Sequence, residues 1–407
     1  MKILVLNCGS SSVKYQLFRM ADESILAKGF VDQIGMDNSV LEHQAAGREK
    51  INFKVEMPDH FSAIRAVLET LIDPNYGVVR DLWEIRAVGH RIVHGGPNFS
   101  NSVLVDDKVV AELRRIIELA PLHNPAAIMG IEACHKQMPN VPMVVVFDTA
   151  FHRGMPPRNY LYGVPYKYYE KYSVRRYGFH GTSHRYVGMR AADMLGKPYE
   201  EAKTISCHLG NGASLCAIDG GRVLDTSMGF TPLAGLLMGT RCGDLDPAVV
   251  YYLMKKENLD AEGINNLLNK QSGLLGLSGV SNDIRPVTAA ALAGNPRAMM
   301  AISVFVRQIL HYIGAYYLEL GGADSIVFTA GIGENSSLIR KKVCSQLAVI
   351  GAALDEEANL NACGETVISL PDSKVKIFVI PTNEELVIAR DTLEIVYEKN
   401  MGLDRFF

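Results

Sequence analysis

The chain has 407 residues, more than one hydrophobic core usually organises, so its length predicts two domains. A net charge of −3 at pH 7 and a charged fraction of 21% exclude a general electrostatic attraction to nucleic acid or to an anionic membrane. Any positive charge that binds an anionic ligand must therefore be concentrated in one place. The seven cysteines are scattered without a Cys-x-x-Cys pair, which argues against a disulfide framework and a structural zinc site. This usage favours the reducing cytosol, so a cytoplasmic protein is expected.

Strand-like and helical runs alternate along the whole chain, which is typical of the α/β class. The first apolar run is too short for a signal peptide and is interpreted as a strand. The expected strands, in chain order, are Ile3–Leu6, Ala87–Val93, Met143–Phe147, Thr204–Leu209, Ser325–Phe328 and Val375–Ile380. Apolar residues at helical spacing predict a helix over Asp107–Leu119, and a second helix is expected over Pro125–His135.

The most apolar long segment of the chain is Ala298–Leu320. Asn295 is suited to cap a helix here, and Pro296 is suited to its first position. Because the segment also carries charged residues such as Arg307 and Glu319, it is interpreted as a buried or interfacial helix and not as a membrane span.

A weak internal repeat points to a duplicated domain. The first strand runs into the turn Asn7–Ser12, and a strand near the middle of the chain runs into the turn His208–Ser214. Aligning Gly9 on Gly210 superimposes the two segments about half the chain length apart.

A second echo pairs Val145–Ala150 with Ile326–Gly331, in the same order and at a similar spacing. Glycine-containing turns after strands recur by chance, so either echo alone is weak. Together they predict two related halves with a cleft between them, and a boundary near Ala150–His152.

Both repeated turns have the composition of anion-binding turns. Inward-pointing backbone N–H groups bind anions, and glycine or serine lets a phosphate approach closely. Lys14 follows the first turn, where it can act as a mobile positive charge. Each turn alone is equally consistent with an ordinary hairpin. The chain has no Walker-type loop, no Gly-x-Gly-x-x-Gly and no protein-kinase signature, so bound ATP is expected to lie against these two turns.

Two other patterns point to alternatives that are less well supported. His90 and His94 are four residues apart, but their segment is strand-like and lacks a carboxylate at metal-ligand spacing, so no zinc site is expected. Residues 153–180 interleave tyrosines with lysines and arginines, as some single-strand-binding proteins do. The slightly negative chain favours a solvated, partly packed connection there instead.

Several strings of the sequence resemble the signatures of the acetate kinase family. Ile3–Lys14 resembles the amino-terminal signature, and Gly89–Gly96 resembles the second one. Further matching strings are Phe147–His152, Tyr177–His184, His208–Gly212, Gly239–Asp244, Ser281–Arg285, Phe328–Asn335 and Pro381–Glu385. The matches occur in order and span nearly the whole chain. His123 and His184 fall in matching stretches, where hydrogen-bonded structural roles and direct substrate contact both remain open.

The resemblance implies a fold class. The expected architecture is α/β, a duplicated ribonuclease-H-like (actin-like ATPase) fold of two domains with an interdomain cleft, and members of the family usually form homodimers. One domain would comprise residues 1–150 plus 386–407, and the other residues 151–385 with the nucleotide pocket. A last helix over Leu386–Glu398 is expected to pack back on the first half.

The resemblance also implies an activity: reversible transfer of the γ-phosphoryl group of ATP to acetate, giving acetyl phosphate and ADP by direct in-line transfer. The reaction would depend on Mg²⁺, for which Mn²⁺ substitutes. Neither nucleic acid nor a membrane is expected as a partner. The closest alternative is a propionate kinase of the same family. The alternative from another class is an ATP-driven chaperone or actin-like polymer, which needs no pair of arginines and hydrolyses ATP without acetate.

Transfer of a phosphoryl group to acetate joins two anions, so the site must supply positive charge and alignment. By the resemblance, Arg91 and Arg241 flank the acetate and the moving phosphoryl group, and His180 donates to that group in the transition state. Asp148 is treated as catalytic in the family. Because acetate, with a pKa of roughly 4–5, is already ionised at neutral pH, we expect Asp148 to orient an arginine or a metal-bound water.

The remaining site residues are also carried over from the resemblance. Asn7 and Glu384 form the implied Mg²⁺ environment, since both offer hard oxygen ligands. The residues implied around ATP are Ser10, Ser12, Lys14, His208, Leu209, Gly210, Asn211, Gly212, Asp283, Ile284, Arg285, Gly331, Ile332, Gly333, Glu334 and Asn335. The residues implied around the methyl group of acetate are Val93, Leu122, Phe179 and Pro232, with Arg91 at the carboxylate.

Overall fold

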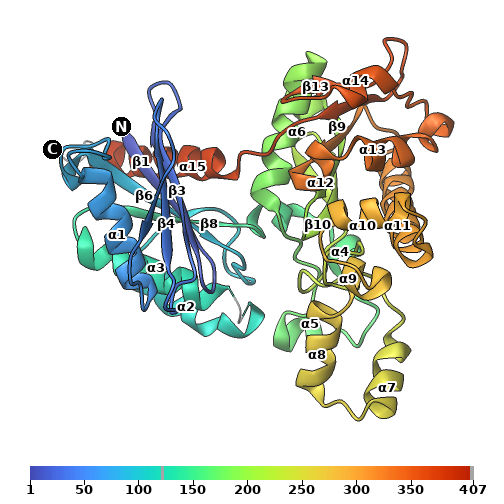
Figure 1. The fold of residues 1–407 in the computed structure, drawn as a ribbon, viewed down its shortest axis with the longest axis horizontal. Coiled ribbons are helices and arrows are strands. Elements are labelled where there is room, and N and C mark those ends of the chain that lie inside the picture. The colour runs from blue at the N-terminus through green and yellow to red at the C-terminus, as the bar shows by residue number, and fades with distance from the viewer. Residues whose placement is uncertain (121–122, 404–407) are drawn as a thin grey trace. The chain divides into compact units, whose positions relative to one another are not determined.

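The computed structural model describes residues 1–120 and 123–403, with side chains as far as residue 397. The chain divides into two compact units, each with its own sheet (Figure 1). Unit 1 consists of Met1–Ala150 together with Asn383–Phe407, and unit 2 consists of Phe151–Thr382. The chain returns to unit 1 at Asn383, whereas the sequence predicts this return at Leu386. Glu384 consequently belongs to unit 1.

Unit 1 is built on one mixed β-sheet with the strand order β5-β4-β3-β2-β1-β6-β8-β7. The strands are β1 (Lys2–Cys8), β2 (Val13–Arg19), β3 (Ser24–Asp32), β4 (Val40–Ala45), β5 (Ile51–Lys54), β6 (Ile85–Ile92), β7 (Val103–Leu104) and β8 (Met143–Phe147). The helices are α1 (His60–Ile72), α2 (Asp107–Arg115), α3 (Asn124–Gln137) and α15 (Glu384–Leu403). Side chains of β1 that point toward α1 and α3, such as Leu4 and Leu6, form the main core of this unit.

Helix α15 packs on the sheet of unit 1, as the family resemblance implies. It contacts β1, β6 and β8, and Figure 1 shows it beside them. A Cβ atom at Gly89 would lie 2.5 Å from Thr392 Oγ1 and 2.6 Å from Ile388 Cγ2, so the glycine permits close packing of the helix on β6. The helix begins earlier than predicted, because Asn383 Oδ1 accepts a hydrogen bond of 3.1 Å from Leu386 N.

Unit 2 contains a second mixed sheet with the strand order β11-β10-β9-β12-β14-β13. Its strands are β9 (Lys203–Leu209), β10 (Ala213–Asp219), β11 (Arg222–Thr226), β12 (Ser325–Thr329), β13 (Thr366–Val367) and β14 (Lys376–Val379). Its helices are α4 (Pro157–Tyr160), α5 (Lys167–Tyr172), α6 (Gly181–Leu195), α7 (Pro247–Lys256), α8 (Ala261–Lys270), α9 (Gly273–Ser278), α10 (Ile284–Leu292), α11 (Pro296–Glu319), α12 (Ala330–Asn335), α13 (Ser337–Cys344) and α14 (Glu356–Leu360).

The two sheets repeat one topology. In unit 1, β3, β2 and β1 are antiparallel neighbours, and β6 and β8 continue the sheet parallel to β1. In unit 2, β11, β10 and β9 are antiparallel neighbours, and β12 and β14 continue parallel to β9. This order and these directions are those of the ribonuclease-H-like fold. The predicted duplicated α/β architecture is confirmed.

Of the two sequence echoes, one is confirmed and one is wrong. Gly9 and Gly210 each open the hairpin turn that follows the first strand of their sheet, as the pairing of β1 with β2 and of β9 with β10 shows. The second echo aligns β8 with β12. However, β12 is the neighbour of β9 and so corresponds to β6, whereas the counterpart of β8 is β14. Buried strands that end in small residues recur in α/β chains, which explains the misalignment.

Two predicted helices differ in their fit to the structure. The helix predicted over Asp107–Leu119 is interrupted, because Ile116 leaves helical geometry (φ −98°, ψ 13°) and a 3₁₀ turn follows over Ile117–Leu119. Helix α11 begins at Pro296 with Asn295 as its cap, as predicted. Within the described residues, α11 alone is long and apolar enough to cross a membrane, a test that buried core helices also pass. One of its sides is buried and contacts β9 and β10.

Candidate active site

Polar residues stand at the carboxyl ends of three strands of unit 1. Strands β1, β6 and β8 are parallel neighbours, so their carboxyl ends meet at one edge of the sheet. Asn7 and Arg91 are the next-to-last residues of β1 and β6, and Asp148 directly follows β8. The N–H of Asp148 donates to Ile92 O (3.0 Å), which holds the start of its loop against β6. Such strand ends are where α/β sheets bind ligands.

Arg91 and Asp148 form a two-pronged ion pair. Arg91 Nε donates to Asp148 Oδ1 (2.9 Å), and Arg91 Nη2 donates to Asp148 Oδ2 (2.7 Å). The side chain of Asp148 is only 2% exposed and that of Arg91 is 19% exposed. Burial opposes the charge of Arg91, but the attraction of Asp148 and Glu384 outweighs it and raises the pKa of the guanidinium. The contact that we expect between Asp148 and an arginine is therefore present, while its role in turnover stays a prediction.

Two further carboxylates belong to this cluster. Glu384 Oε2 lies 3.5 Å from Arg91 Nη2, and Lys14 Nζ lies 2.6 Å from Glu385 Oε1. Burial raises the pKa of Glu384, and the nearby carboxylate of Asp148 adds to this effect although Arg91 opposes it. The cluster thus holds three carboxylates and two cationic side chains. The excess of carboxylates means that a bound cation would be electrostatically favourable at this edge of the sheet.

The donor set fits a magnesium ion held by few protein ligands. Carboxylate and amide oxygens are the ligands that Mg²⁺ prefers, and Glu384 and Asn7 supply one of each. In the part of the chain that the structure describes, no group of three or more His, Cys, Asp or Glu side chains is arranged to hold a metal. Water and substrate oxygens would therefore complete the coordination, as is usual for this ion.

Both predicted phosphate turns are hydrogen-bonded hairpin turns. In unit 1, Gly9 N donates to Ser12 O (2.8 Å), and the carbonyl oxygen of Gly9 lies 2.7 Å from His60 Nε2. Ser10 is exposed at the tip of this turn, and Ser12 is half-buried. The turn is therefore anchored at Gly9 by His60, with Ser10 exposed and the Ser12 hydroxyl lying close to Gly9.

The turn of unit 2 lies beside two predicted catalytic side chains, His180 and Arg241. Gly210 N donates to Gly212 O (3.0 Å). A Cβ atom at Gly212 would lie 3.4 Å from His180 Nε2 and 3.5 Å from Arg241 Nη1. The missing side chain of Gly212 thus leaves a small space that two predicted catalytic residues flank. A phosphoryl group placed there would meet both donors.

His180 is held in a fixed and strained orientation. Its backbone has φ 57° and ψ 27°, the left-handed conformation that non-glycine residues adopt at a cost. Its ring stacks on His208 with centroids 4.0 Å apart, and its Nδ1 lies 2.8 Å from Ser214 Oγ. Nδ1 is therefore engaged by the protein, and Nε2 is the atom that faces Gly212.

Arg241 lies on the long loop that follows β11. Its Nη1 donates to Pro232 O (3.2 Å), and the loop is closed where Gly235 N donates to Asp244 Oδ1 (2.8 Å). Burial lowers the pKa of Arg241 from its very high ordinary value, which leaves the guanidinium charged at neutral pH. Unlike Arg91, this guanidinium does not pair with a carboxylate among the residues that the structure describes.

Of the residues predicted around acetate, Phe179 and Pro232 belong to unit 2 and Val93 belongs to unit 1. Phe179 is buried, and its carbonyl oxygen lies 2.9 Å from His152 Nε2. The carbonyl of Pro232 contacts Arg241, so one predicted wall residue adjoins a predicted catalytic residue. Leu122 lies outside the described residues.

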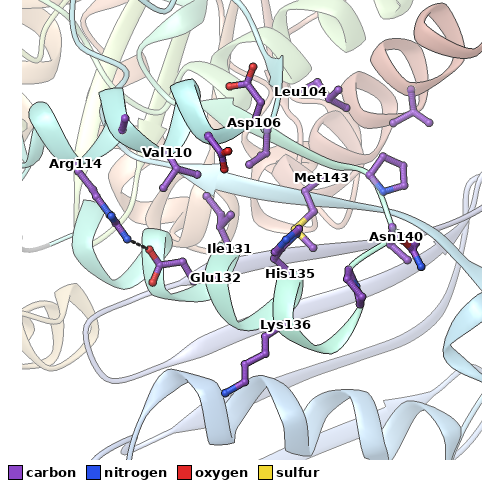
Figure 2. Close-up of a pocket in the computed structure, with 17 residues that line it drawn as sticks. Leu104, Asp106, Val110, Arg114, Ile131, Glu132, His135, Lys136, Asn140 and Met143 are labelled. Atoms are coloured by element: carbon purple, nitrogen blue, oxygen red, sulfur yellow. Dashed lines mark hydrogen bonds and ion pairs between the residues drawn. The ribbon is translucent and has the colours of Figure 1, made fainter.

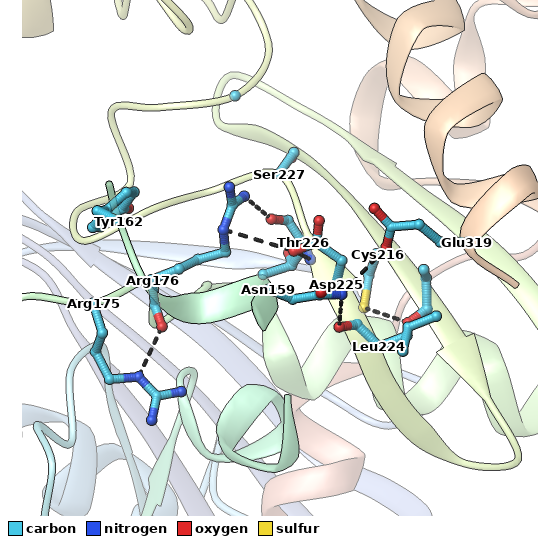
Figure 3. Close-up of polar contacts among 12 residues, drawn as sticks. Asn159, Tyr162, Arg175, Arg176, Cys216, Leu224, Asp225, Thr226, Ser227 and Glu319 are labelled. Carbon is cyan, nitrogen blue, oxygen red and sulfur yellow. Dashed lines mark hydrogen bonds and ion pairs between the residues drawn. The ribbon is translucent and has the colours of Figure 1, made fainter. Parts of the chain in front are cut away.

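A half-buried arginine, Arg176, supports the segment that leads to Phe179 and His180 (Figure 3). Arg176 Nη1 donates to the carbonyl oxygen of Thr226, and Arg176 Nε lies 3.6 Å from Asp225 Oδ1. Burial raises the pKa of Asp225 to about 6 despite this arginine. The end of the tyrosine-rich connection is therefore packed, whereas Tyr166 and Tyr172 in its middle are 58% and 55% exposed, which agrees with the predicted solvated, partly packed connection.

A cavity of about 720 Å³ in unit 2 brings together three of the predicted ATP motifs. Its lining residues are Gly210, Asn211, Asn282, Asp283, Ile284, Arg285, Thr288, Gly331, Ile332, Asn335 and Ser336. The predicted ATP residues of unit 2 outside this lining are His208, Leu209, Gly212, Gly333 and Glu334. The sequence analysis did not identify Asn282, Thr288 and Ser336. A cavity of this size is typical of small-molecule sites.

Arg340 holds the short helix α12 on one side of this cavity and was not identified from the sequence. It is 2% exposed, and its Nη1 donates to the carbonyl oxygens of Gly333 (2.9 Å) and Glu334 (2.8 Å). Its Nε donates to Asn359 Oδ1 (2.7 Å). Ala330, at the start of α12, has φ 64°, another strained residue at the cavity. Only the tertiary structure shows that Arg340 stabilises the conformation of α12.

A second cavity, of about 950 Å³, lies on unit 1 (Figure 2). It is lined by residues of α2 and α3 and by Met143, at the amino end of β8 and so opposite to Asp148. Two of its charged groups, Arg114 and Glu132, are paired with each other at 2.5 Å. This cavity is not part of the candidate active site.

The repeated ribonuclease-H-like units, with a ligand-sized cavity next to His180 and Arg241, place the chain in the structural class of actin-like ATPases and kinases. Within this class, the model of the acetokinase family matches residues 2–390, and the chain belongs to that family.

Individual relatives agree with this assignment. The acetate kinase of Halothermothrix orenii is 56% identical over 396 residues, which are 97% of this chain and 100% of that protein. The crystal structure of Porphyromonas gingivalis acetate kinase is similar with a TM-score of 0.93 and 48% identity, covering 97% of this chain and 99% of that one. A propionate kinase from Francisella tularensis has a TM-score of 0.90 and 42% identity, with coverage of 97% and 99%.

Proposed function

We propose that the protein catalyses the reversible transfer of the γ-phosphoryl group between ATP and acetate, with acetyl phosphate and ADP as products. The observation that carries this proposal is the space above Gly212, which His180 Nε2 and Arg241 Nη1 flank beside the cavity of unit 2. Membership of the acetokinase family supports acetate as the acceptor.

Unit 2 supplies the groups that bind the nucleotide and stabilise the moving phosphoryl group. The cavity holds the adenosine portion, and the turn Gly210–Gly212 directs the phosphates toward His180 and Arg241. As the group moves, charge spreads over its equatorial oxygens, and a fixed donor and a fixed cation stabilise this charge without rearranging. Because no carboxylate in the described part of the chain pairs with Arg241, its charge is available to the phosphoryl group.

Unit 1 supplies the group that binds the carboxylate of acetate. Asp148 occupies the Nε and Nη2 edge of the Arg91 guanidinium, and Glu384 also lies 3.5 Å from Nη2, so Nη1 is the nitrogen that would hold the anion. In this proposal Asp148 orients Arg91 and removes no proton, because acetate reacts in its ionised form.

The metal in this proposal is Mg²⁺, with Mn²⁺ as a substitute, and Asn7 and Glu384 are the residues that hold it. When bound, the ion neutralises charge on the phosphate oxygens of ATP. Lys14, Ser10 and Ser12 assist at the same phosphates from the neighbouring hairpin turn. The surplus of carboxylates at this edge of unit 1 supports the assignment.

An assay that traps acyl phosphate as hydroxamate tests the proposal directly. With ATP and Mg²⁺, acetate should give product, and omission of Mg²⁺ should abolish it. Hydrolysis of ATP at an equal rate without acetate would instead indicate the chaperone or polymer class. ATP hydrolysis and hydroxamate formation should therefore be measured on the same protein.

Propionate kinase is the second candidate, favoured by the similarity to the Francisella tularensis enzyme. The higher identity to acetate kinases supports acetate as the preferred acid. One additional methylene group changes binding in an apolar pocket by about 1–3 kcal/mol, so kcat/KM for propionate should be roughly 10- to 200-fold lower. A value for propionate equal to or above that for acetate would select the second candidate.

We further infer a cytoplasmic homodimer. Helix α11 exposes two large apolar side chains near its ends, with Met300 61% and Leu318 80% exposed. Large exposed apolar side chains are enriched at subunit interfaces. Light scattering should give twice the mass of one chain, and Leu318→Glu should reduce it to that of a monomer. A monomeric wild-type protein would contradict the inference.

A further inference from the structure

A chain of four hydrogen-bonded side chains ends at His180. Ser214 Oγ lies 2.8 Å from His180 Nδ1 and also 2.8 Å from His184 Nε2. On the far side, His184 Nδ1 lies 2.9 Å from Ser206 Oγ. Ser206, Ser214 and His184 are all 0% exposed. The two serines come from β9 and β10 and the histidine comes from α6, so the sheet and the helix together build this chain.

Both ring nitrogens of His184 are engaged by serine hydroxyls. This answers the question that the sequence leaves open, since His184 has no nitrogen left for a substrate. Burial lowers the pKa of His184 well below its ordinary value, and the neighbouring His152 and His208 add to this effect. The imidazole of His184 is therefore neutral, with one N–H donor and one acceptor nitrogen.

Each neutral imidazole and the Ser214 hydroxyl has one proton to donate, so the tautomer of His184 determines that of His180. If His184 carries its proton on Nε2, it donates to Ser214 Oγ, and the Ser214 hydroxyl donates to His180 Nδ1. A neutral His180 then carries its own proton on Nε2. If His184 carries its proton on Nδ1, the directions reverse, and His180 Nε2 becomes a bare lone pair. The state of His184 thus determines what His180 presents at the space above Gly212.

The direction follows from the charge of the substrate. His180 Nε2 faces that space, where a phosphoryl oxygen carries negative charge, and a lone pair there would repel it. Ser206 can donate to His184 Nδ1, so every hydrogen bond of the chain can point the same way. Hydrogen bonds aligned in series polarise one another in a buried environment.

We propose that Ser214 and His184 are positioning residues that hold His180 in the Nε2–H tautomer. In this arrangement Ser206 donates to His184, His184 donates to Ser214, and Ser214 donates to His180 Nδ1. The inference rests on the proposed function, because it gives His180 the donor that phosphoryl transfer requires. Neither Ser214 nor His184 touches the substrate. Both act only through His180.

Nitrogen NMR of the protein labelled with ¹⁵N-histidine tests the proposal. Long-range ¹H–¹⁵N correlations report which ring nitrogen carries the proton, and His180→Gln identifies the His180 signals. We expect protonated Nε2 and unprotonated Nδ1 in the wild type. In Ser214→Ala the donor to Nδ1 is lost, and His180 should become a mixture of tautomers.

Kinetics and a matched control complete the test. Ser214→Ala should lower kcat by roughly 10- to 100-fold with KM for ATP within about twofold, and Ser214→Thr, which keeps a hydroxyl, should restore most of kcat. Ser183 is an equally buried serine whose Oγ lies 2.8 Å from Nδ1 of the stacked His208, outside the chain. Ser183→Ala should leave the His180 tautomer unchanged.

An Nδ1–H tautomer in the wild type would overturn the proposal, and this spectrum decides even if Ser214→Ala does not fold. An unchanged tautomer in a folded Ser214→Ala would overturn it as well. The expected spectra in a protein that makes no acyl phosphate would support the chain of hydrogen bonds and reject the proposed function. Normal acetate turnover with an Nδ1–H tautomer would support the proposed function and reject the chain of hydrogen bonds.

Discussion

The two units share one strand order but furnish opposite kinds of chemistry. At the strand ends of unit 1, charged groups are paired with each other: Arg91 with Asp148 and Lys14 with Glu385. In unit 2, neutral serine and histidine side chains hold His180, and Arg241 binds a backbone carbonyl. The same fold therefore orients Arg91 with a carboxylate partner in one unit and holds Arg241 without a carboxylate partner in the other.

This difference has a physical basis. A carboxylate partner fixes the geometry of a guanidinium, but it also cancels much of its charge. Such an arrangement suits Arg91, which in our proposal aligns acetate. A carbonyl partner leaves the charge available, which suits Arg241, the residue that we expect to stabilise the phosphoryl group. The comparison predicts larger losses in unit 2 than in unit 1.

The largest effect is expected for Arg241→Ala. Loss of the available charge should lower kcat by about 10³-fold, or roughly 4 kcal/mol of transition-state stabilisation. The hydroxamate assay measures this, and Arg241→Lys, which keeps the charge but not the fork, should recover part of the loss. A decrease of less than tenfold would remove Arg241 from the mechanism.

Asp148→Asn should have the next largest effect. The amide cannot hold the guanidinium of Arg91 with two charge-assisted bonds, so kcat should fall by about 10²-fold with a raised KM for acetate. Asp22 is a matched control, because it accepts from Arg19 Nε (3.0 Å) and Nη2 (2.7 Å) at an exposed site. Asp22→Asn should leave kcat unchanged. Near-normal turnover of Asp148→Asn with unchanged Mg²⁺ affinity would exclude the orienting role.

Asp225 tests whether unit 2 disfavours buried negative charge. Burial raises its pKa from 3.8 to about 6, and Glu319 adds to this while Arg176 opposes it. Since the folded-state pKa is the higher one, this group contributes stability below pH 3.8 that is lost as the pH rises through 6. Asp225→Asn should therefore match the wild type near pH 4 and be more stable by about 3 kcal/mol at pH 8.

Chemical denaturation at the two pH values measures this difference. The exposed Asp219, on the neighbouring strand β10, provides the control. Asp219→Asn should change stability equally little at both pH values. A wild type that is the more stable protein at pH 8 would show that Arg176, and not burial, governs Asp225.

Lys14→Met should have the smallest effect. Lys14 is 52% exposed and its partner Glu385 only 11%, so loss of this half-buried ion pair should lower the free energy of unfolding by about 1–2 kcal/mol. If Lys14 serves the phosphates of ATP, KM for ATP should rise by roughly three- to tenfold. Lys28→Met, a lysine on β3 of the same sheet, should not change KM. Equal values for both variants would leave Lys14 without a role in binding.

Local patterns accounted for much of the fold. The buried parallel strands were predicted from continuous apolar runs, and β8 has the predicted bounds. The hairpin strands β2, β3 and β10 were missed, since sheet pairing and not an apolar run stabilises them. The second repeat was misaligned for a related reason, because strand order is a property of the sheet.

The sequence by itself determined the family, the α/β class and most of the residues of the candidate site, because signature strings and apolar runs are local and readable in order. Only the tertiary structure decided which side chains act on one another. Arg91 and Asp148 are separated by 57 residues, and His180 and Ser214 by 34. Hydrogen bonds depend on distance and direction in space, so the orientation of each catalytic group is settled only when its strands and helices pack together.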